Sequence, residues 1–322
     1  MAAPAWRRRR PGVADILPRA MDVRLRLQLV YALPLIIILA CAPNDARGVR
    51  AHGAVIDVDA FGDTLRGPAQ PPQRIVSLNP TTTEIVFAIG AGARLVGRSH
   101  WDSFPDSARL VPDLGPALGP NIETVIAAHP DLVLLYASAD DERAATRLHD
   151  AGIPVAALRI DRIEGFRTAT RDIGALLGDS ARAANVVDSV TRTLDRVRAA
   201  THDLPRPTVA MVTWQHPVIV IGGGSFINEL IEVAGGHNVY ADLASPSPTV
   251  SLEDLVRRDP DFLLASPKGR VNLERDPRWQ AVRAVREHHV LVIDTTIVGR
   301  PSPVMGQAAA SLAGLLHPGI QP

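Results

Sequence analysis

Aromatic residues gather where predicted strands end, and they are the side chains best suited to contact a ligand. They are Trp101 and Phe104 after the strand at 95–97, Tyr136 at the end of 132–136, and Trp214 after 208–213. Ligand clefts of parallel sheets form at such carboxyl ends, and aromatic faces there can stack on a flat ligand. Only 4% of the residues are aromatic, so this grouping makes binding as good an interpretation as packing. Filling of the hydrophobic core is an equally good account of each side chain.

Arg300 is a candidate for binding an anionic group. It lies in residues 298–303, directly after the last predicted strand. Its guanidinium presents forked donors that match a carboxylate or a phosphate. The same position is equally compatible with a solvated surface arginine, so both interpretations stay open.

Glu123 and Glu253 occupy equivalent places in two similar segments, NIETVIAAHPDLVLL from Asn121 and SLEDLVRRDPDFLLA from Ser251. In each segment a polar cap precedes the glutamate, and a short helix leads to a Pro-Asp pair and an apolar strand. The helix dipole favours a carboxylate in the first turn, which can account for both glutamates. Since they would stand at matched places on two lobes, they could also contact two basic patches of a two-fold symmetric partner and fix its orientation.

No combination of residues predicts catalysis or direct binding of a metal ion. Residues 222–225 (GGGS) precede a helix but lack the lysine and spacing of a phosphate-binding loop, so a tight strand-to-helix turn is preferred. Ser225 is not in a G-x-S-x-G elbow. His288 and His289 have no third ligand at a suitable spacing. We therefore expect a protein that is not an enzyme and has no metal site of its own.

Short apolar strands alternate with helices along most of the chain. The strands are predicted at 75–78, 95–97, 132–136, 155–158, 208–213, 218–221, 262–265 and 290–293. Helices are predicted at 144–151 and 226–234, and another begins at Thr81, where Thr81 and Glu84 have the spacing of a capping box. Strands that are apolar throughout are typical of a parallel sheet covered on both faces. The fold class is therefore α/β.

One long helix separates the two halves of the chain. From Ser180, which we interpret as the N-cap, apolar residues recur on one helical face as far as Ala200. The face consists of Ala183, Val187, Val190, Leu194 and Val197. With the repeated segments, this predicts two Rossmann-like lobes with mostly parallel sheets, at 73–179 and 204–322, joined by an interlobe helix at 180–203. Clefts between domains are common ligand sites.

The N-terminus has the order of an export signal. Basic residues at 7–10 and an apolar run at 25–40 precede Cys41, the only cysteine. Residues 38–41 resemble a bacterial lipobox, in which the cysteine is lipidated; a plain signal peptide or an uncleaved anchor is the alternative. We expect residues 1–41 to be a signal peptide, with Met21 as an alternative start, and 42–72 to be a flexible tether. The protein would be exported, in the periplasm or at the cell surface, and attached to the membrane by lipid.

The charge balance argues against a polyanionic partner. The chain has 34 basic and 34 acidic residues, whereas a nucleic-acid-binding protein usually carries a basic excess on one face. No nucleic-acid partner is expected.

From Arg74 to His317 the chain resembles the periplasmic binding proteins of iron-chelate and cobalamin ABC importers. The resemblance rests on RIVSLNPTTTEIVFAIGAG, LVGRSHWDSFP, AGIPV and GGGSFINELIEVAGGHNVYAD, as well as the two repeated segments. It implies a solute-binding protein that delivers a metal chelate to a permease dimer. The chain is most similar to the cobalamin-binding branch, whose docking glutamates fall on Glu123 and Glu253. That branch has aromatic residues at Trp101 and Tyr136, and an arginine at Arg300.

Half of the corrin contacts that this branch implies are changed in the present chain. The changed positions fall at or near Ala117, Ile219, Ser247 and Thr296. The expected ligand is a cobalt corrinoid, with haem or a ferric siderophore as alternatives in the same transport role. A periplasmic sensor is a rival class. A periplasmic hydrolase is another, but it requires a convergent nucleophile and base, which the sequence lacks.

Overall fold

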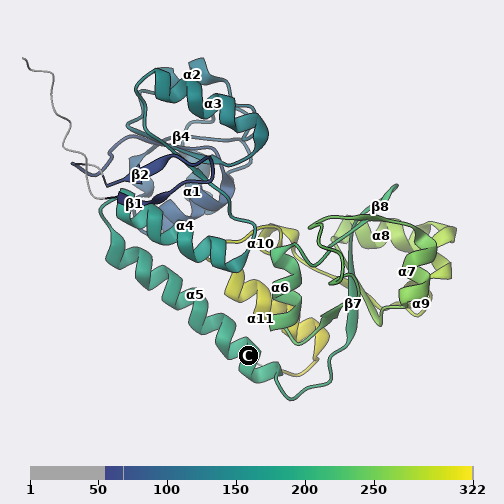
Figure 1. Ribbon diagram of the computed structural model, residues 1–322. Helices are drawn as coiled ribbons and strands as arrows, with labels where there is room; N and C mark the ends of the chain where they lie inside the picture. The colour runs from purple at the N-terminus through teal and green to yellow at the C-terminus, as the bar shows by residue number, and fades with distance from the viewer. Residues whose placement is uncertain (1–54, 68, 321–322) are drawn as a thin grey trace, which may run out of the picture. The chain divides into compact units, whose positions relative to one another are not determined.

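The computed structural model describes residues 55–67 and 69–320 (Figure 1). The predicted signal peptide, Met21, Cys41 and residues 42–54 of the predicted tether lie outside the described residues. The strands are β1 (Val55–Val58), β2 (Thr64–Arg66), β3 (Ile75–Ser77), β4 (Leu95–Arg98), β5 (Leu132–Tyr136), β6 (Val155–Leu158), β7 (Thr208–Gln215), β8 (Val218–Val220), β9 (His237–Asn238), β10 (Thr249–Val250), β11 (Phe262–Ala265) and β12 (Val290–Val292).

The helices include every one that the sequence predicts. They are α1 (Pro80–Ala88), α2 (Ile122–Ala127), α3 (Ala139–Asp150), α4 (Ile163–Leu176), α5 (Ser180–Thr201), α6 (Phe226–Val233), α7 (Leu252–Arg258), α8 (Pro267–Arg275), α9 (Arg283–Arg286), α10 (Thr295–Val298) and α11 (Met305–Leu316), with short 3-10 helices η1 (Gly92–Arg94), η2 (Asp106–Leu110) and η3 (Pro277–Ala281). In the described part of the chain, no helix combines the length and the apolar character needed to cross a bilayer.

The N-terminal lobe contains a parallel sheet in the order β4-β3-β5-β6. Successive side chains of a strand point to opposite faces, and in β5 both sets are buried. Leu132 and Leu134 pack with residues of α1, α4 and α5, whereas Val133 and Leu135 pack with residues of α2 and α3. Helices on both faces explain why the strands are apolar throughout.

The C-terminal lobe contains a mixed sheet in the order β10-β8-β7-β11-β12, with β9 beside the start of β7. Strands β7, β11 and β12 are parallel, as predicted. Strand β8 is antiparallel to β7 because two residues, His216 and Pro217, connect them, and a parallel pair needs a crossover of a dozen residues or more. Both faces are again covered: Leu264 packs with α6 and α11, and Leu263 with α7 and α8.

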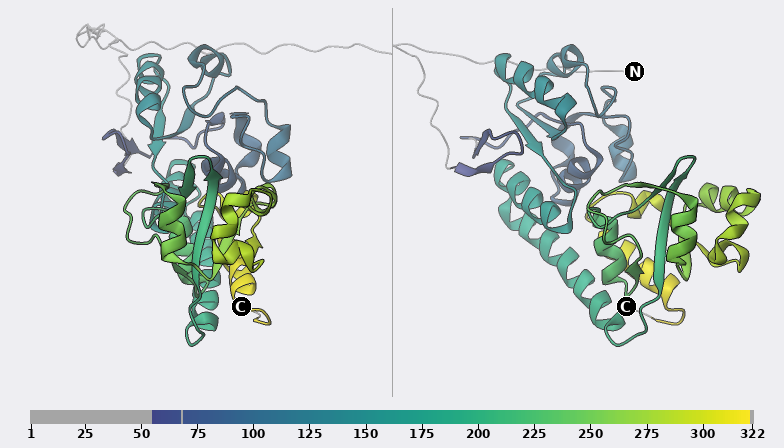
Figure 2. Two further views of the ribbon diagram at one scale, coloured as in Figure 1. Left: turned by 90° about the vertical axis from the view of Figure 1, so that its right-hand side faces the viewer. Right: turned by 45° about the vertical axis from the view of Figure 1, so that its right-hand side comes forward.

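Helix α5 joins the two lobes, as the sequence predicts. Its 22 residues span about 33 Å at ~1.5 Å per residue. The buried face contains the five apolar residues predicted for it, and its N-cap is Asp179 rather than Ser180. The helix packs on α4 of the N-terminal lobe and on α6 and α11 of the C-terminal lobe, an arrangement that Figures 1 and 2 both show. One hydrophobic cluster therefore continues through both lobes along α5.

Two further local predictions are wrong. The tether prediction fails for residues 55–66, which form the β1–β2 hairpin; the Asp59 carboxylate attaches it by accepting a hydrogen bond from the Ala157 N–H, 3.0 Å away. The capping box at Thr81 and Glu84 is also wrong. Helix α1 begins one residue earlier, at Pro80, and its N-cap is Asn79, whose side chain accepts from the Thr81 N–H. A proline at the first helical position suits this start, since its missing N–H would have no partner there.

Candidate ligand-binding cleft

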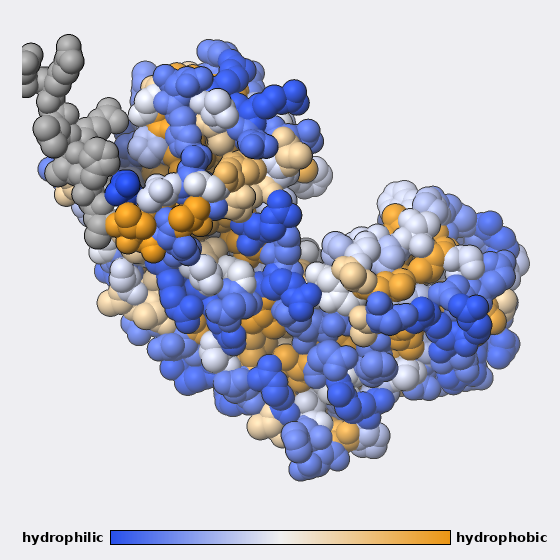
Figure 3. Space-filling view, in the orientation of Figure 1, coloured by the Kyte–Doolittle hydropathy of each residue, from blue (hydrophilic) through white to orange (hydrophobic). Residues whose placement is uncertain are grey.

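A cavity of about 500 Å³ lies between the two lobes, and the surface is hollowed between them in Figure 3. The N-terminal lobe contributes the last residue of β5 and the residues that follow β3 and β6, and the C-terminal lobe contributes the start of α6, Pro246 and the segment after α10. The lining residues are Asn79, Pro80, Thr81, Tyr136, Arg159, Ile160, Asp161, Ser225, Phe226, Pro246, Gly299, Arg300 and Pro301. This volume is within the usual range for small-molecule sites.

Tyr136 and Arg300, two of the predicted ligand residues, line this cavity together. The Tyr136 hydroxyl donates a hydrogen bond of 2.7 Å to Asp161 Oδ1. Burial, with Asp161 beside it, raises the pKa of Tyr136 to about 12, so this phenol is a neutral donor at physiological pH. Arg159, which also lines the cavity, donates from Nη2 to the carbonyl oxygen of Ala137 at 2.9 Å.

Trp101, Phe104 and Trp214 do not line the cavity. Their side chains are exposed, with relative accessibilities of 65%, 42% and 58%. The alternative that each fills the hydrophobic core is therefore wrong for these three. Large exposed aromatic side chains are typical of interaction surfaces when they lie together. Trp101 has such a neighbour, since its ring lies against that of His100 with the centroids 4.8 Å apart. Their contact with a ligand stays a prediction.

A buried network fixes the loop that carries Trp101. The side chain of Asp102 is fully buried and accepts hydrogen bonds from the hydroxyls of Ser99 (2.6 Å) and Thr83 (2.7 Å). Thr83 belongs to α1, so the network connects the loop after β4 to the helix at the cleft. Burial raises the pKa of Asp102, and the two hydroxyls oppose the shift.

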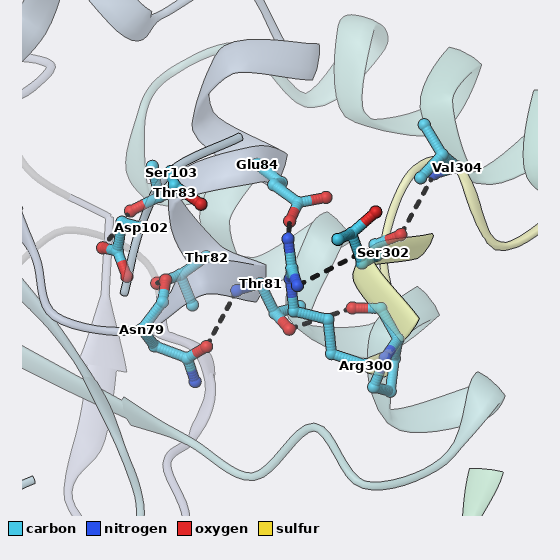
Figure 4. Close-up of polar contacts among 12 residues, drawn as sticks. Asn79, Thr81, Thr82, Thr83, Glu84, Asp102, Ser103, Arg300, Ser302 and Val304 are labelled. Atoms are coloured by element: carbon cyan, nitrogen blue, oxygen red, sulfur yellow. Dashed lines mark hydrogen bonds and ion pairs between the residues drawn. The ribbon is translucent and has the colours of Figure 1, made fainter. Parts of the chain in front are cut away.

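Arg300 forms an ion pair with Glu84 of the other lobe, which Figure 4 shows. Its Nε donates to Glu84 Oε1 at 2.6 Å, and its Nη2 contacts the same oxygen. Glu84 is only 3% exposed. The neighbouring Thr81 hydroxyl donates to the carbonyl oxygen of Pro301 at 2.9 Å. Arg300 is thus neither a free surface arginine nor a free anion receptor, because a carboxylate of the protein already contacts it.

A second interlobe bridge involves Arg162 and Glu229. Arg162 Nε donates to Glu229 Oε1 at 2.7 Å, and the Ile163 N–H donates to Oε2, also at 2.7 Å. Helix α4 has no cap from its own N-cap side chain, so this carboxylate of α6 serves as its cap. The two bridges hold the lobes together beside the cleft.

Glu123 and Glu253 are both exposed, each in the first turn of its helix. Glu123 Oε1 lies 2.9 Å from Arg147 Nη2, a solvated pair that contributes little to stability. Their positions on α2 and α7 agree with the repeated segments. Docking of a partner on them stays a prediction.

The GGGS segment is a tight turn, as the sequence predicts. A Cβ atom on Gly222, Gly223 or Gly224 would lie 2.1–2.2 Å from a backbone carbonyl oxygen of residues 241–245, so only glycine fits. Ser225 is the N-cap of α6 and accepts from the Ile227 N–H. In the described ranges, no three His, Cys, Asp or Glu side chains converge as ligands for a metal ion.

Sequence reasoning missed four residues: Asn79, Arg159 and Asp161, which line the cleft, and Glu84, which contacts Arg300 behind it. Three of them follow β3 or β6, and the rule that located the aromatic residues, the carboxyl ends of parallel strands, would have found them. The spacing of Thr81 and Glu84 predicts a capping-box role for Glu84 instead. Nothing local in the sequence distinguishes its actual contact, which is with a residue 216 positions away.

Comparison with known proteins identifies the family. Residues 75–296 match the family described as periplasmic binding protein. The vitamin B12-binding protein of Vibrio parahaemolyticus is 25% identical over 247 residues, which cover 76% of this chain and 89% of that protein. An ABC transporter substrate-binding lipoprotein of Bacillus subtilis is 27% identical over 261 residues, or 77% and 81% of the two chains.

Solved structures share the fold. A periplasmic haem-binding protein from Pseudomonas aeruginosa superposes with a TM-score of 0.68 at 25% identity, covering 78% of this chain and 95% of that one. The periplasmic vitamin B12-binding protein of Vibrio cholerae gives a TM-score of 0.68 at 22% identity, covering 76% and 97%. The two-lobed α/β fold is thereby confirmed. Since the family match spans more than two thirds of the residues, the chain belongs to the periplasmic binding protein family.

Proposed function

We propose that the chain is the solute-binding protein of an ABC importer and that it binds a cobalt corrinoid in the cleft between its lobes. It carries the ligand to a permease dimer and performs no catalysis. The observation that carries this proposal is the interlobe cavity, at which Tyr136, Arg159 and Arg300 present polar groups. Relatives that align over most of the chain are named vitamin B12-binding proteins, which supports the choice of ligand.

The ligand residues of this proposal form two groups. Tyr136 and Arg300 line the cleft: Arg300 provides hydrogen-bond donors for polar groups of the chelate, and Tyr136, whose hydroxyl already donates to Asp161, provides an acceptor oxygen. Trp101, Phe104 and Trp214 provide exposed aromatic surface for its apolar faces. Trp101 and Phe104 belong to the segment after β4, and Trp214 lies near the end of β7. Such a division is usual in small-molecule sites, which combine apolar walls with a few placed polar groups.

The same proposal includes docking and attachment to the membrane. Glu123 and Glu253, one in each lobe, contact the two halves of the permease dimer. Cys41 carries the lipid after removal of residues 1–40, which agrees with the lipoprotein named among the relatives. A Cys41→Ser variant should be released into the soluble fraction of the cell, and its retention in washed membranes would contradict the lipid anchor.

Calorimetric titration tests the ligand. The purified mature chain should bind cyanocobalamin with a one-to-one stoichiometry, and haemin and a ferric hydroxamate siderophore should bind more weakly. Proteins named as haem-binding share the fold, so haemin is the most informative competitor. Tighter binding of haemin than of cyanocobalamin would overturn the corrinoid assignment and keep the transport role. No binding of any of the three chelates would overturn the whole ligand class.

A further inference from the structure

Glu84 is held in a way that mere interlobe attachment does not require. Its carboxylate is buried, and both Arg300 contacts reach a single oxygen, Oε1. The other oxygen, Oε2, is buried without a hydrogen-bond partner in the described part of the chain. An unsatisfied buried carboxylate oxygen is costly, and burying an ion pair often stabilises a protein less than apolar packing does. Groups kept in such surroundings are frequently functional.

Burial of Glu84 favours its neutral form, against the opposing positive charge of Arg300. Burial raises its pKa from 4.5 to about 7, which Arg300 opposes and the buried Asp102 carboxyl increases. Arg300, from the segment after α10, and Asp102, from the loop after β4, are the charged groups that act on it; Asp102 in turn lies near Arg98. Near pH 7 the positive charge of Arg300 is therefore only partly compensated.

Arg300 faces the cleft with donors to spare. A guanidinium has five N–H groups. One from each of its three nitrogens is used, on Glu84 and on the carbonyl oxygen of Thr296. The other two have no partner among the residues that the structure describes. Arg159 and the first turns of α1 and α6 line the same cavity and add positive potential, which the carboxylate of Asp161, also in the lining, partly offsets.

We propose that Arg300 binds an oxyanion of the ligand, a phosphate or carboxylate group, and that Glu84 is the positioning residue that holds Arg300 and, by taking up a proton, leaves the positive charge of Arg300 available to the ligand. The proton passes from solvent to Oε2, the oxygen without a partner. The ligand oxyanion then replaces ionised Glu84 as the counter-charge of Arg300, while neutral Glu84 keeps its hydrogen bond through Oε1. This inference rests on the proposed function.

A definite pH dependence follows. Glu84 is ionised above pH 7 and competes with the ligand for Arg300, so binding there requires proton uptake. Below pH 7 the carboxyl is already neutral. Affinity for an oxyanion-bearing chelate should therefore rise as the pH falls from 8 to 6. The rise is roughly tenfold if ligand binding raises the pKa of Glu84 by about one unit.

Titration calorimetry at pH 6 and pH 8, in buffers of different ionisation enthalpy, measures both affinity and proton uptake. The wild-type protein should bind cyanocobalamin roughly tenfold more tightly at pH 6 and take up a fraction of a proton at pH 8. Glu84→Gln should bind equally at both pH values, without proton uptake. Arg300→Met should bind weakly at both. E84Q should fold, because the glutamine side chain still offers an oxygen that accepts a hydrogen bond from Arg300. Proton uptake is measured on the wild-type protein, so that part of the test does not depend on any variant.

The source of the oxyanion is distinguished by paired ligands. A pH effect seen with cyanocobalamin but absent with cobinamide, which lacks the nucleotide phosphate, assigns the site to that phosphate. An effect seen with haemin but absent with its dimethyl ester assigns it to carboxylates. Cyanocobalamin binding without proton uptake, or with the same pH response in E84Q, would overturn the role of Glu84 and leave the proposed function intact. Binding of neither cyanocobalamin nor haemin would overturn the proposed ligand class itself.

Discussion

Asp131 and Asp261 make equivalent contacts in the two lobes. The Asp131 carboxylate accepts hydrogen bonds from the Gln73 and Arg74 N–H groups at 2.8 and 2.9 Å, immediately before β3. The Asp261 carboxylate accepts from the Thr208 N–H at 2.9 Å, at the start of β7. Each aspartate thus ties its own strand, β5 or β11, to the neighbouring central strand of the sheet. The two repeated segments therefore have the same structural surroundings as well as similar sequences.

This equivalence gives a prediction for Glu123 and Glu253, which precede the two aspartates by the same number of residues. The double variant Glu123→Ala with Glu253→Ala should retain ligand affinity and stability, because both side chains are exposed. It should lose stimulation of the importer, measured as ligand-dependent ATP hydrolysis and uptake in proteoliposomes. Glu142→Ala with Glu287→Ala, which removes one exposed glutamate from each lobe elsewhere, is the matched control. Unchanged uptake in the first variant would refute the docking assignment.

The raised pKa of Glu84 predicts a pH dependence of stability. Its folded-state pKa, about 7, exceeds the ordinary value of 4.5. The group therefore contributes stability that is complete below pH 4.5 and lost as the pH rises to 7. Relative to the wild-type protein, Glu84→Gln should gain about 2–3 kcal/mol of unfolding free energy between pH 5 and pH 8. Urea denaturation at both pH values measures this difference, and a constant difference would contradict the assignment.

Asn79 should affect both stability and ligand binding, because it caps α1 and lines the cleft. Asn79→Ala should cost about 1 kcal/mol of unfolding free energy and weaken ligand binding. Asn121→Ala is the control: Asn121 caps α2 in the same way but is not among the residues that line the cleft. It should cost a similar amount of stability with no change in affinity. Equal affinities of the two variants would show that the α1 cap plays no part in binding.

The glycine turn before α6 should not tolerate a side chain. In Gly223→Ala the new Cβ would meet the carbonyl oxygen of Ala241 at 2.1 Å, so thermal and urea unfolding should show a loss of about 1–3 kcal/mol. Gly314, exposed in the interior of α11, has nothing within 4 Å of its Cβ position. Gly314→Ala should therefore stabilise the protein by about 0.5–1 kcal/mol. A stable Gly223→Ala variant would mean that the 241–245 segment can move aside.

The sequence by itself determined the features whose causes are local. The length of the apolar runs predicts strands β5 and β6 with their observed bounds, and the helical period of apolar residues predicts the buried face of α5. Both predictions succeed because apolar side chains recur at the spacing of the element that buries them. The two similar segments that begin at Asn121 and Ser251 predict that α2 and α7 occupy equivalent places in the two lobes. The short connection between the strands predicted at 208–213 and 218–221 would also have predicted their antiparallel pairing.

Only the tertiary structure decided how Glu84 is used and which candidates meet. Thr81 and Glu84 have the spacing of a capping box, but Glu84 is buried against Arg300, 216 residues away, because folding removes the carboxylate from water and a buried charged group needs a partner. Tyr136 and Arg300 share the cavity, while Trp101 and Trp214 do not line it. Such pairings depend on the packing of two lobes against each other, and no spacing along the chain contains that information.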